Sequence, residues 1–345
     1  ISTGINFSMV SNKNNTIFSI LNDTISYIDS LFTSTSTQGE KMGASYFSIS
    51  KKIKKFEISS GIRTEIIDWK LQIDNKQESP KKELELFPSL SLTYNLKNAN
   101  ITLSYNKSIN RTSFQATSQE FIYVNPILYV QGNPYLKNTL YNSLSFNVLA
   151  FQSIYFEINY SDEKNYTALG FFNNDSIIIA KYINYNRKKI FSTLNFNIRN
   201  EKLSTNIGMS FSKLMSSFVY NNEILKPQKI GFVLTTTNIL ALSKTFELYL
   251  SGQYQSAIDD DYFKYKPTYK IDFGFRKYFL KKSLRLAIYS VINEKEEYDL
   301  RLNNLHIIHE NYENKYMVFF TVLYRFNYQN LQKNQSSLNE VKGRL

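Results

Sequence analysis

The chain has 345 residues, of which 42% are hydrophobic and 15% aromatic, with 26 Tyr, 26 Phe and a single Trp. It contains no Cys, which excludes disulfides and thiolate metal sites, and no stretch approaches the 18 consecutive apolar residues of a transmembrane helix. The formal net charge is +12, but the basic residues are not clustered on one helical face, so we do not expect nucleic acid as a partner.

Apolar and polar residues alternate with a period of two along most of the chain, which is the pattern of β-strands between two environments. The opposite side of each strand is mostly polar, although Tyr249 interrupts one of them. A membrane can be crossed by such strands only in a closed sheet, because lipid offers no partner for free backbone groups. The apolar sides are, in chain order, Ile101, Leu103 and Tyr105; Leu194, Phe196 and Ile198; Phe246, Leu248, Leu250 and Tyr254; and Tyr269, Ile271, Phe273 and Phe275.

The last predicted strand, Tyr316–Phe326, shows the alternation best. One side has aromatic residues at both ends and aliphatic residues nearer Phe320 in the middle. Amphipathic rings favour the two membrane interfaces and aliphatic side chains favour the hydrocarbon, so we expect this side to face lipid.

The lengths of the connections distinguish a membrane barrel from a soluble sandwich. Short turns are predicted near Lys54, Lys97, Ala150, Asn200, Leu242 and Lys281, and longer polar connections at residues 21–39, 73–85, 110–138, 221–227, 258–265 and 297–314. Outer-membrane barrels have this alternation of tight periplasmic turns and long outer loops. The sequence therefore predicts an all-β, antiparallel transmembrane β-barrel with about 14 strands in the cell outer membrane of a Gram-negative bacterium.

Two segments deviate from the alternating pattern. Residues 176–199 must form one long strand despite the basic run Arg187–Lys189, so we expect a bulged strand that protrudes above the membrane; an extra hairpin is the alternative. Residues 329–345 are polar and lack alternation, which predicts a disordered tail. The expected organisation is a barrel domain at 1–328 followed by this tail.

Charged clusters offer few candidates for chemistry. His306 and His309 with Glu310 in a long outer loop could capture a metal, and Asp259–Asp261 could hold Ca²⁺, but a solvated loop is the preferred interpretation of each. No nucleophile–base pair or phosphate loop is present, so we expect no catalytic residue, no metal site and no cofactor. Inward-facing charges are expected at Glu57, Arg63, Lys270, Asp272, Arg285 and Arg325, paired with each other or with a luminal domain.

The loop at 110–138 is the best candidate for ligand contact. It combines aromatic rings with amide side chains, which suits stacking on a ligand with hydrogen bonds around it. The same composition suits a loop that folds over the barrel mouth and packs on itself. The candidate ligand-binding residues are Asn110, Arg111, Tyr123, Tyr129, Asn133 and Tyr135.

Several motifs together resemble those of a known family. They are Tyr46–Ser50, a Lys-rich turn and Gly61–Glu65; Leu86–Leu90; Leu103–Asn106 with Ile109–Arg111; Gly132–Lys137, similar to the family's GNP loop; and the final Tyr324–Phe326. The order and spacing resemble the TonB-dependent-receptor-like outer-membrane β-barrel family of Bacteroidota type. Thr112 departs from the family's pattern, which often has Pro there.

The resemblance implies the C-terminal part of a barrel of about 22 strands, importing a scarce nutrient in a TonB-dependent manner. It implies a luminal plug and contact with the TonB system through a region before Ile1, outer-membrane lipid around the barrel, and a surface lipoprotein as a further partner. The chain starts without Met or export signal, so we expect a fragment. The alternatives are a stand-alone channel of about 14 strands and a barrel-embedded hydrolase.

Overall fold

The computed structural model describes residues 1–22, 25–29, 32–74, 76–77, 81–174, 176–220, 223–279, 284–302, 305–311 and 315–324. The predicted tail at 329–345, the turn at Lys281 and the inward-facing Arg325 lie outside these residues. The sheet has 17 strands, and its long strands form one antiparallel meander in which each pairs with the next. These strands are β1 (Ser2–Thr16), β4 (Ser34–Ile53), β5 (Phe56–Ile73), β7 (Lys81–Asn95), β8 (Ala99–Asn110), β11 (Thr139–Ala150), β12 (Ile154–Asn174), β13 (Ile177–Arg199), β14 (Leu203–Leu214), β17 (Gly231–Ser243), β18 (Phe246–Gln255), β21 (Thr268–Phe279), β22 (Leu284–Asn293) and β25 (Tyr316–Tyr324).

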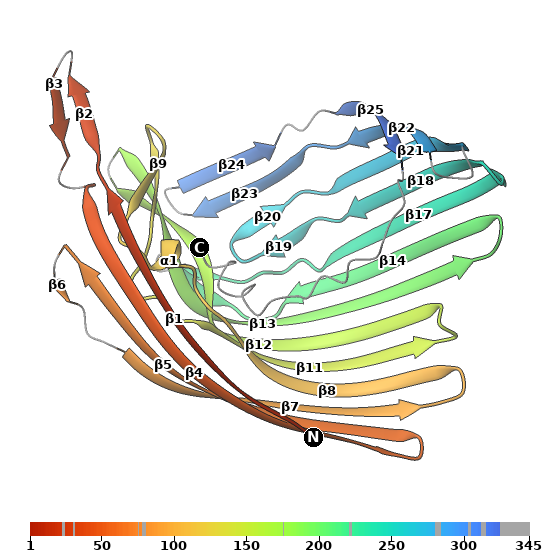
Figure 1. Ribbon diagram of the computed structural model, residues 1–345. Helices are drawn as coiled ribbons and strands as arrows, with labels where there is room; N and C mark the ends of the chain where they lie inside the picture. Colours follow the sequence, from red (N-terminus) through yellow and green to blue (C-terminus); the bar gives the residue numbers. More distant parts are fainter. Residues whose placement is uncertain are drawn as a thin grey trace.

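The meander bends into a wall that curves around a central space (Figure 1). Within the described residues, β1 pairs in register with β4 alone and β25 with β22 alone. The two strands lie far apart in Figure 1, so the wall has two open edges. The predicted all-β antiparallel wall with about 14 strands is confirmed.

The two faces of the wall differ as the alternation predicts. On β25, Tyr316, Val318 and Phe320 are 68%, 74% and 67% exposed. On the concave face of β4 and β5, Gln38 and Glu65 are fully buried. A soluble protein would bury such an apolar row and expose the charges, so this inversion is the signature of a wall surrounded by lipid.

Tight turns join the strands at one end of the wall, at Lys54, 96–98, 151–153 and 200–202, as predicted. Phe151 and Gln152 are the central residues of a β-turn closed by the Ser153 N–H and the Ala150 carbonyl, and both have positive φ, at 53° and 54°. This is the type I′ geometry, whose twist matches that of the flanking strands. At the other end the connections are long, so the two ends of the wall differ in the length of their connections.

The long connections contain more structure than the sequence predicts. The segments expected to be loops include β2 (Ser19–Asn22), β3 (Ile25–Ile28), β6 (Lys76–Gln77), α1 (Phe114–Thr117), β9 (Phe121–Asn125), β10 (Leu128–Gln131), β15 (Phe218–Tyr220), β16 (Glu223–Leu225), β19 (Ile258–Asp260), β20 (Phe263–Tyr265), β23 (Glu296–Leu302) and β24 (Leu305–Asn311). Most of these short strands pair with one another, while β6 pairs with β5 and β10 also with β13, and this pairing satisfies their backbone groups. Their pairing could not be seen in a polar, weakly periodic sequence.

The strands β12 and β13 extend beyond their neighbours. Their pairing runs to Asn174 and Ile177, whereas β11 reaches only Lys164 on β12 and β14 only Lys189 on β13. The single long strand predicted at 176–199 is confirmed, but the bulge lies in β12, at the register shift between Glu163 and Tyr166. We call the paired extension, Tyr166–Asn174 with Ile177–Tyr185, the tower.

Candidate functional site

Residues 111–138 fold inward from the long-loop end of the wall, and we call them the inward loop. Its helix α1 begins after Ser113, whose hydroxyl accepts a hydrogen bond from the Ala116 N–H at 3.2 Å. The fully buried Gln38 of β4 donates to the Phe114 carbonyl at 3.2 Å and accepts from the Thr117 hydroxyl at 3.0 Å. One glutamine therefore fastens the helix to the concave face of β4.

A buried ion pair fixes the start of the inward loop. The guanidinium of Arg111 contacts the carboxylate of Glu65 on β5 and lies 2.9 Å from the sulfur of Met42. Arg111 is buried and Glu65 is fully buried, while the partly exposed Arg63 contacts the other oxygen of Glu65. A buried carboxylate is stable only when it is paired in this way.

The far side of the inward loop is attached to the tower. The Asn133 amide donates to the Tyr182 carbonyl at 2.9 Å, and the Lys137 N–H donates to the Asn184 side chain at 2.7 Å. Strand β10 pairs in parallel with β13 from Leu128 and Ile178 onward. The loop thus crosses the concave side of the wall from β4 and β5 to β13.

A glycine allows the loop to close on itself. A Cβ at Gly132 would lie 2.0 Å from the carbonyl oxygen of Ser118, so no larger residue fits without moving the backbone. The glycine that opens the Gly132–Lys137 motif is therefore required by packing. In the same turn the Asn133 N–H donates to the Ala116 carbonyl at 2.7 Å.

The six candidate ligand residues divide into anchors and exposed groups. Arg111 and Asn133 hold the inward loop in place. Asn110 ends β8 opposite Thr139. The rings of Tyr123 and Tyr129 meet edge to face at 5.6 Å, and Tyr135 is 63% exposed. Ligand contact by these residues stays a prediction.

Aromatic rings from two outer connections meet at the loop's outer end. Phe32 stacks on Tyr129 at 5.1 Å and contacts Phe121 edge to face at 4.9 Å. Phe18 lies 5.7 Å from Phe32 and 6.4 Å from Tyr129. This cluster joins the base of the β2–β3 hairpin to β9 and β10, with Tyr123 more than half exposed at its edge.

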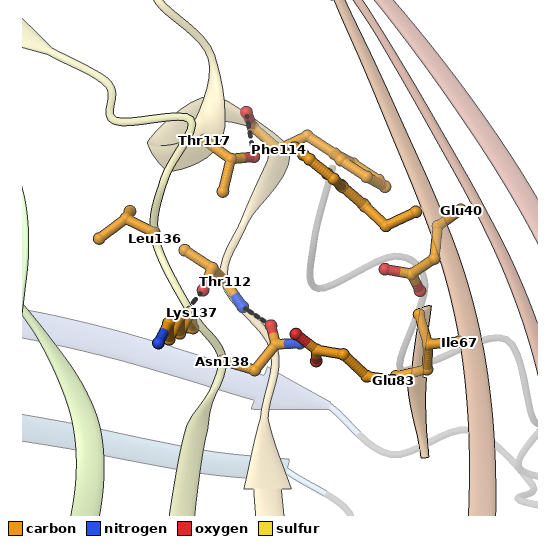
Figure 2. Close-up of a pocket in the computed structure, with 10 residues that line it drawn as sticks. Glu40, Ile67, Glu83, Thr112, Phe114, Thr117, Leu136, Lys137 and Asn138 are labelled. Atoms are coloured by element: carbon orange, nitrogen blue, oxygen red, sulfur yellow. Dashed lines mark hydrogen bonds between the residues drawn. The ribbon is translucent and has the colours of Figure 1, made fainter. Parts of the chain in front are cut away.

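A small cavity separates the inward loop from the wall (Figure 2). It holds about 50 Å³ and is lined by Glu40, Ile67, Trp69, Glu83, Thr112, Phe114, Thr117, Leu136, Lys137 and Asn138. The Thr112 N–H donates to the Asn138 side chain at 3.1 Å beside it. This volume suits a few waters rather than a nutrient, so the cavity is a packing feature of the loop anchor.

A second structure covers the mouth from the opposite side. Strands β19, β20, β23 and β24 form a four-stranded sheet, which we call the lid. Leu300 is fully buried and Tyr262 nearly so, where the lid packs against Phe171 and Ile183 of the tower. On the lid itself, Lys266 and then Lys295 hold the pKa of the Glu297 carboxyl below its usual range.

The acidic run at 259–261 is less solvated than expected, because Asp259 and Asp261 have protein partners. Asp259 is buried and accepts from the Gln228 and Lys229 N–H groups at 2.9 and 3.1 Å. Asp261 accepts from the guanidinium of Arg187 at 2.9 Å. Protein N–H donors therefore bind one oxygen of Asp259 and one of Asp261, in the place that a cation would take.

The positions of the two histidines do not suit a metal ion that both would bind. His306 and His309 lie three residues apart on β24, and residues at that spacing on a strand point to opposite faces. His309 stacks on Tyr298 at 4.6 Å with 15° between the rings. No group of metal-binding side chains is present within the described ranges.

Sequence reasoning missed Gln38, Glu65 and Arg187, which organise the mouth. Gln38 and Glu65 lie on inward positions of their strands, so the alternation could have placed them inside the wall. Their partners come from loops more than 40 residues away, and no local pattern reveals such pairing.

Comparisons with known proteins agree with this architecture. The yersiniabactin uptake receptor FyuA of Yersinia pestis is 10% identical, covers 94% of this chain and 51% of its own, and superposes with a TM-score of 0.61. The siderophore receptor PiuA of Acinetobacter baumannii is 11% identical over 88% and 46%, with a TM-score of 0.57. The FrpB iron transporter of Neisseria meningitidis is 14% identical over 85% and 46%, with a TM-score of 0.53. The chain spans about half the length of these structures.

These structures share the fold of the chain, and the three proteins are receptors or transporters. No curated protein matches the sequence. The family model named "Outer membrane protein beta-barrel family" matches residues 1–328, which include all of the described wall. The chain therefore belongs to the outer membrane protein beta-barrel family and resides in the cell outer membrane.

Proposed function

We propose that the chain forms the wall and outer loops of a TonB-dependent receptor of Bacteroidota type that imports a scarce nutrient and is not an enzyme. The observation that supports this best is the inward folding of two structures over the mouth, the inward loop and the lid. A general diffusion channel needs an open mouth, whereas a receptor needs a surface that recognises its ligand before entry. Of the six candidate residues of 110–138, Tyr123 and Tyr135 supply exposed rings for that contact.

The two open edges support the idea that this wall is the C-terminal part of a larger barrel. Each backbone group left unpaired in lipid costs several kcal/mol. Further strands of the same barrel would pair with β1 and β25, and a barrel of about 22 strands encloses a lumen wide enough for a plug. The plug and the contact with TonB then belong to the region before Ile1, and a surface lipoprotein would join at the outer loops.

The competing functions are less well supported. A stand-alone channel would require β1 and β25 to pair with each other, and they lie far apart (Figure 1). A barrel-embedded hydrolase would require a nucleophile beside a base, and His309 instead stacks on the ring of Tyr298.

The test is energy-dependent uptake by the full-length protein in its own outer membrane. Cells are grown with ferric siderophores, haem, cobalamin or oligosaccharides as the limiting nutrient, with and without the gene. Growth that requires both this gene and TonB supports the proposal. Gene-dependent growth that persists after TonB is deleted would refute it in favour of a passive channel.

A further inference from the structure

We propose that Arg187 and Asp261 form a latch that holds the lid closed against the tower and limits entry into the lumen. This goes beyond the proposed function, because the contact would control access whatever ligand is carried. Arg187 lies on β13 at the base of the tower, and Asp261 lies in the turn between β19 and β20 of the lid.

The lid and the tower are attached to different parts of the wall. Its strands belong to the connections between β18 and β21 and between β22 and β25. The tower is built from β12 and β13, and β14 and β17 lie between the two regions in the sheet. The contact therefore spans part of the mouth, and Figure 1 shows the lid strands on the inner side of the curved wall.

Arg187 lies between a carboxylate of the wall and one of the lid. Its Nε donates to Glu163 on β12 at 2.5 Å, and its Nη1 donates to Asp261 at 2.9 Å. Its guanidinium lies 3.2 Å from the ring centre of Tyr166, and only 7% of the residue is exposed. Opening the lid would leave this buried guanidinium with Glu163 and remove the carboxylate that the lid provides.

On the lid side of the latch, Asp261 has more than one partner. Asp261 also accepts a hydrogen bond from the Tyr185 hydroxyl of the tower, and Asp260 lies 3.8 Å from Arg187. Asp261 has a φ of 55°, a left-handed conformation that Asp tolerates better than most residues. The tight turn thus presents one carboxylate to two tower donors at once.

The apolar contact beside the latch is small. Among the lid's described apolar side chains, Leu300 and Tyr262 are the buried ones, and Phe171 meets Tyr262 and Phe263 edge to face. The charge-assisted, buried pair of Arg187 and Asp261 adds to this apolar patch and to the hydrogen bonds of Asp259 in holding the lid. Under the lid, a hollow of about 250 Å³ is lined by Lys189, Ser210, Gln255 and the lid's Tyr265, so opening would expose this part of the inner wall.

The test uses the full-length protein in intact cells and substituted-cysteine labelling. The chain has no native Cys, so Ser210→Cys reports on the covered hollow alone. A small maleimide and a bulky maleimide–polyethylene glycol are added from outside in the parent, Arg187→Gln, Asp261→Asn and Glu310→Gln backgrounds. Glu310→Gln is the matched control, because its pair with Lys295 lies within the lid.

We expect Arg187→Gln and Asp261→Asn to raise the rate of labelling by the bulky reagent roughly tenfold, the change that follows from losing one charge-assisted contact, while Glu310→Gln has no effect. A second measurement uses the pair Ala168→Cys and Leu300→Cys, which belong to the apolar cluster where the lid packs on the tower. Oxidation should crosslink this pair readily in the parent and several-fold more slowly with Arg187→Gln. Variants inserted at equal levels that label and crosslink as the parent does would overturn the latch.

Discussion

Leu250 tests whether the exposed apolar row faces lipid. It lies in the middle of β18, is 46% exposed, and pairs across the sheet with Phe273, which is 47% exposed. An arginine at the midplane of the lipid face of a barrel costs about 2–4 kcal/mol. We expect Leu250→Arg to lower the free energy of unfolding by about this amount, since its neighbours on that face offer no carboxylate.

Ser251 provides a matched control one residue along the same strand. It lies on the concave face opposite Asp272, whose Oδ1 is buried without a hydrogen-bond partner. An arginine there can pair with Asp272, so Ser251→Arg should change stability by no more than about 1 kcal/mol.

The assay is urea unfolding of the full-length protein from lipid vesicles, followed by heat-modifiable electrophoretic mobility. The midpoint should fall clearly for Leu250→Arg and stay near the parent for Ser251→Arg. Equal losses from the two substitutions, or a larger loss from Ser251→Arg, would show that the assignment of the faces is wrong.

Four further predictions follow from the mouth, the edges and the lid. A cysteine at Tyr135 should react with a membrane-impermeant maleimide in intact cells and one at Lys97 should not; the reverse result would invert the orientation of the wall. Arg111→Leu should lower the free energy of unfolding by about 2–3 kcal/mol, a small loss for a buried pair because Glu65 keeps its contact with Arg63. It should also speed proteolysis of the inward loop, and an unchanged cleavage rate would show that Arg111 does not anchor the loop. The isolated chain, refolded in detergent and transferred to a bilayer, should give no steady single-channel conductance, because its edges are unpaired; a stable conducting monomer would favour the channel of about 14 strands. The lowered pKa of Glu297 means that its ion pairs stabilise the lid above the carboxyl's unfolded pKa and are lost as the pH falls through the folded value. Protease sensitivity of the lid should therefore rise in acid, and Glu297→Gln should make that rise smaller; an acid-induced rise of the same size in Glu297→Gln would contradict a role for these pairs.

The sequence by itself determined the wall. A period-two alternation such as that of Tyr269–Phe275 depends only on which environment each side of a strand meets, and that information is local. The positions of the tight turns could also be predicted, because the chain must reverse direction where each alternating stretch ends. The long strand at 176–199 was predicted despite its basic run, although the bulge that accommodates the run lies in the partner strand.

Only the tertiary structure decided what the outer connections do. Asp259–Asp261 looked like a solvated loop, and the loop at 110–138 suited either ligand contact or packing over the barrel mouth. The structure pairs Asp261 with Arg187 and Arg111 with Glu65. A charged residue has the same local sequence signature whether water or a distant ion partner satisfies it. The choice depends on which surfaces the curved wall brings within a few ångströms, because burial is stable only where a partner of opposite charge comes with it.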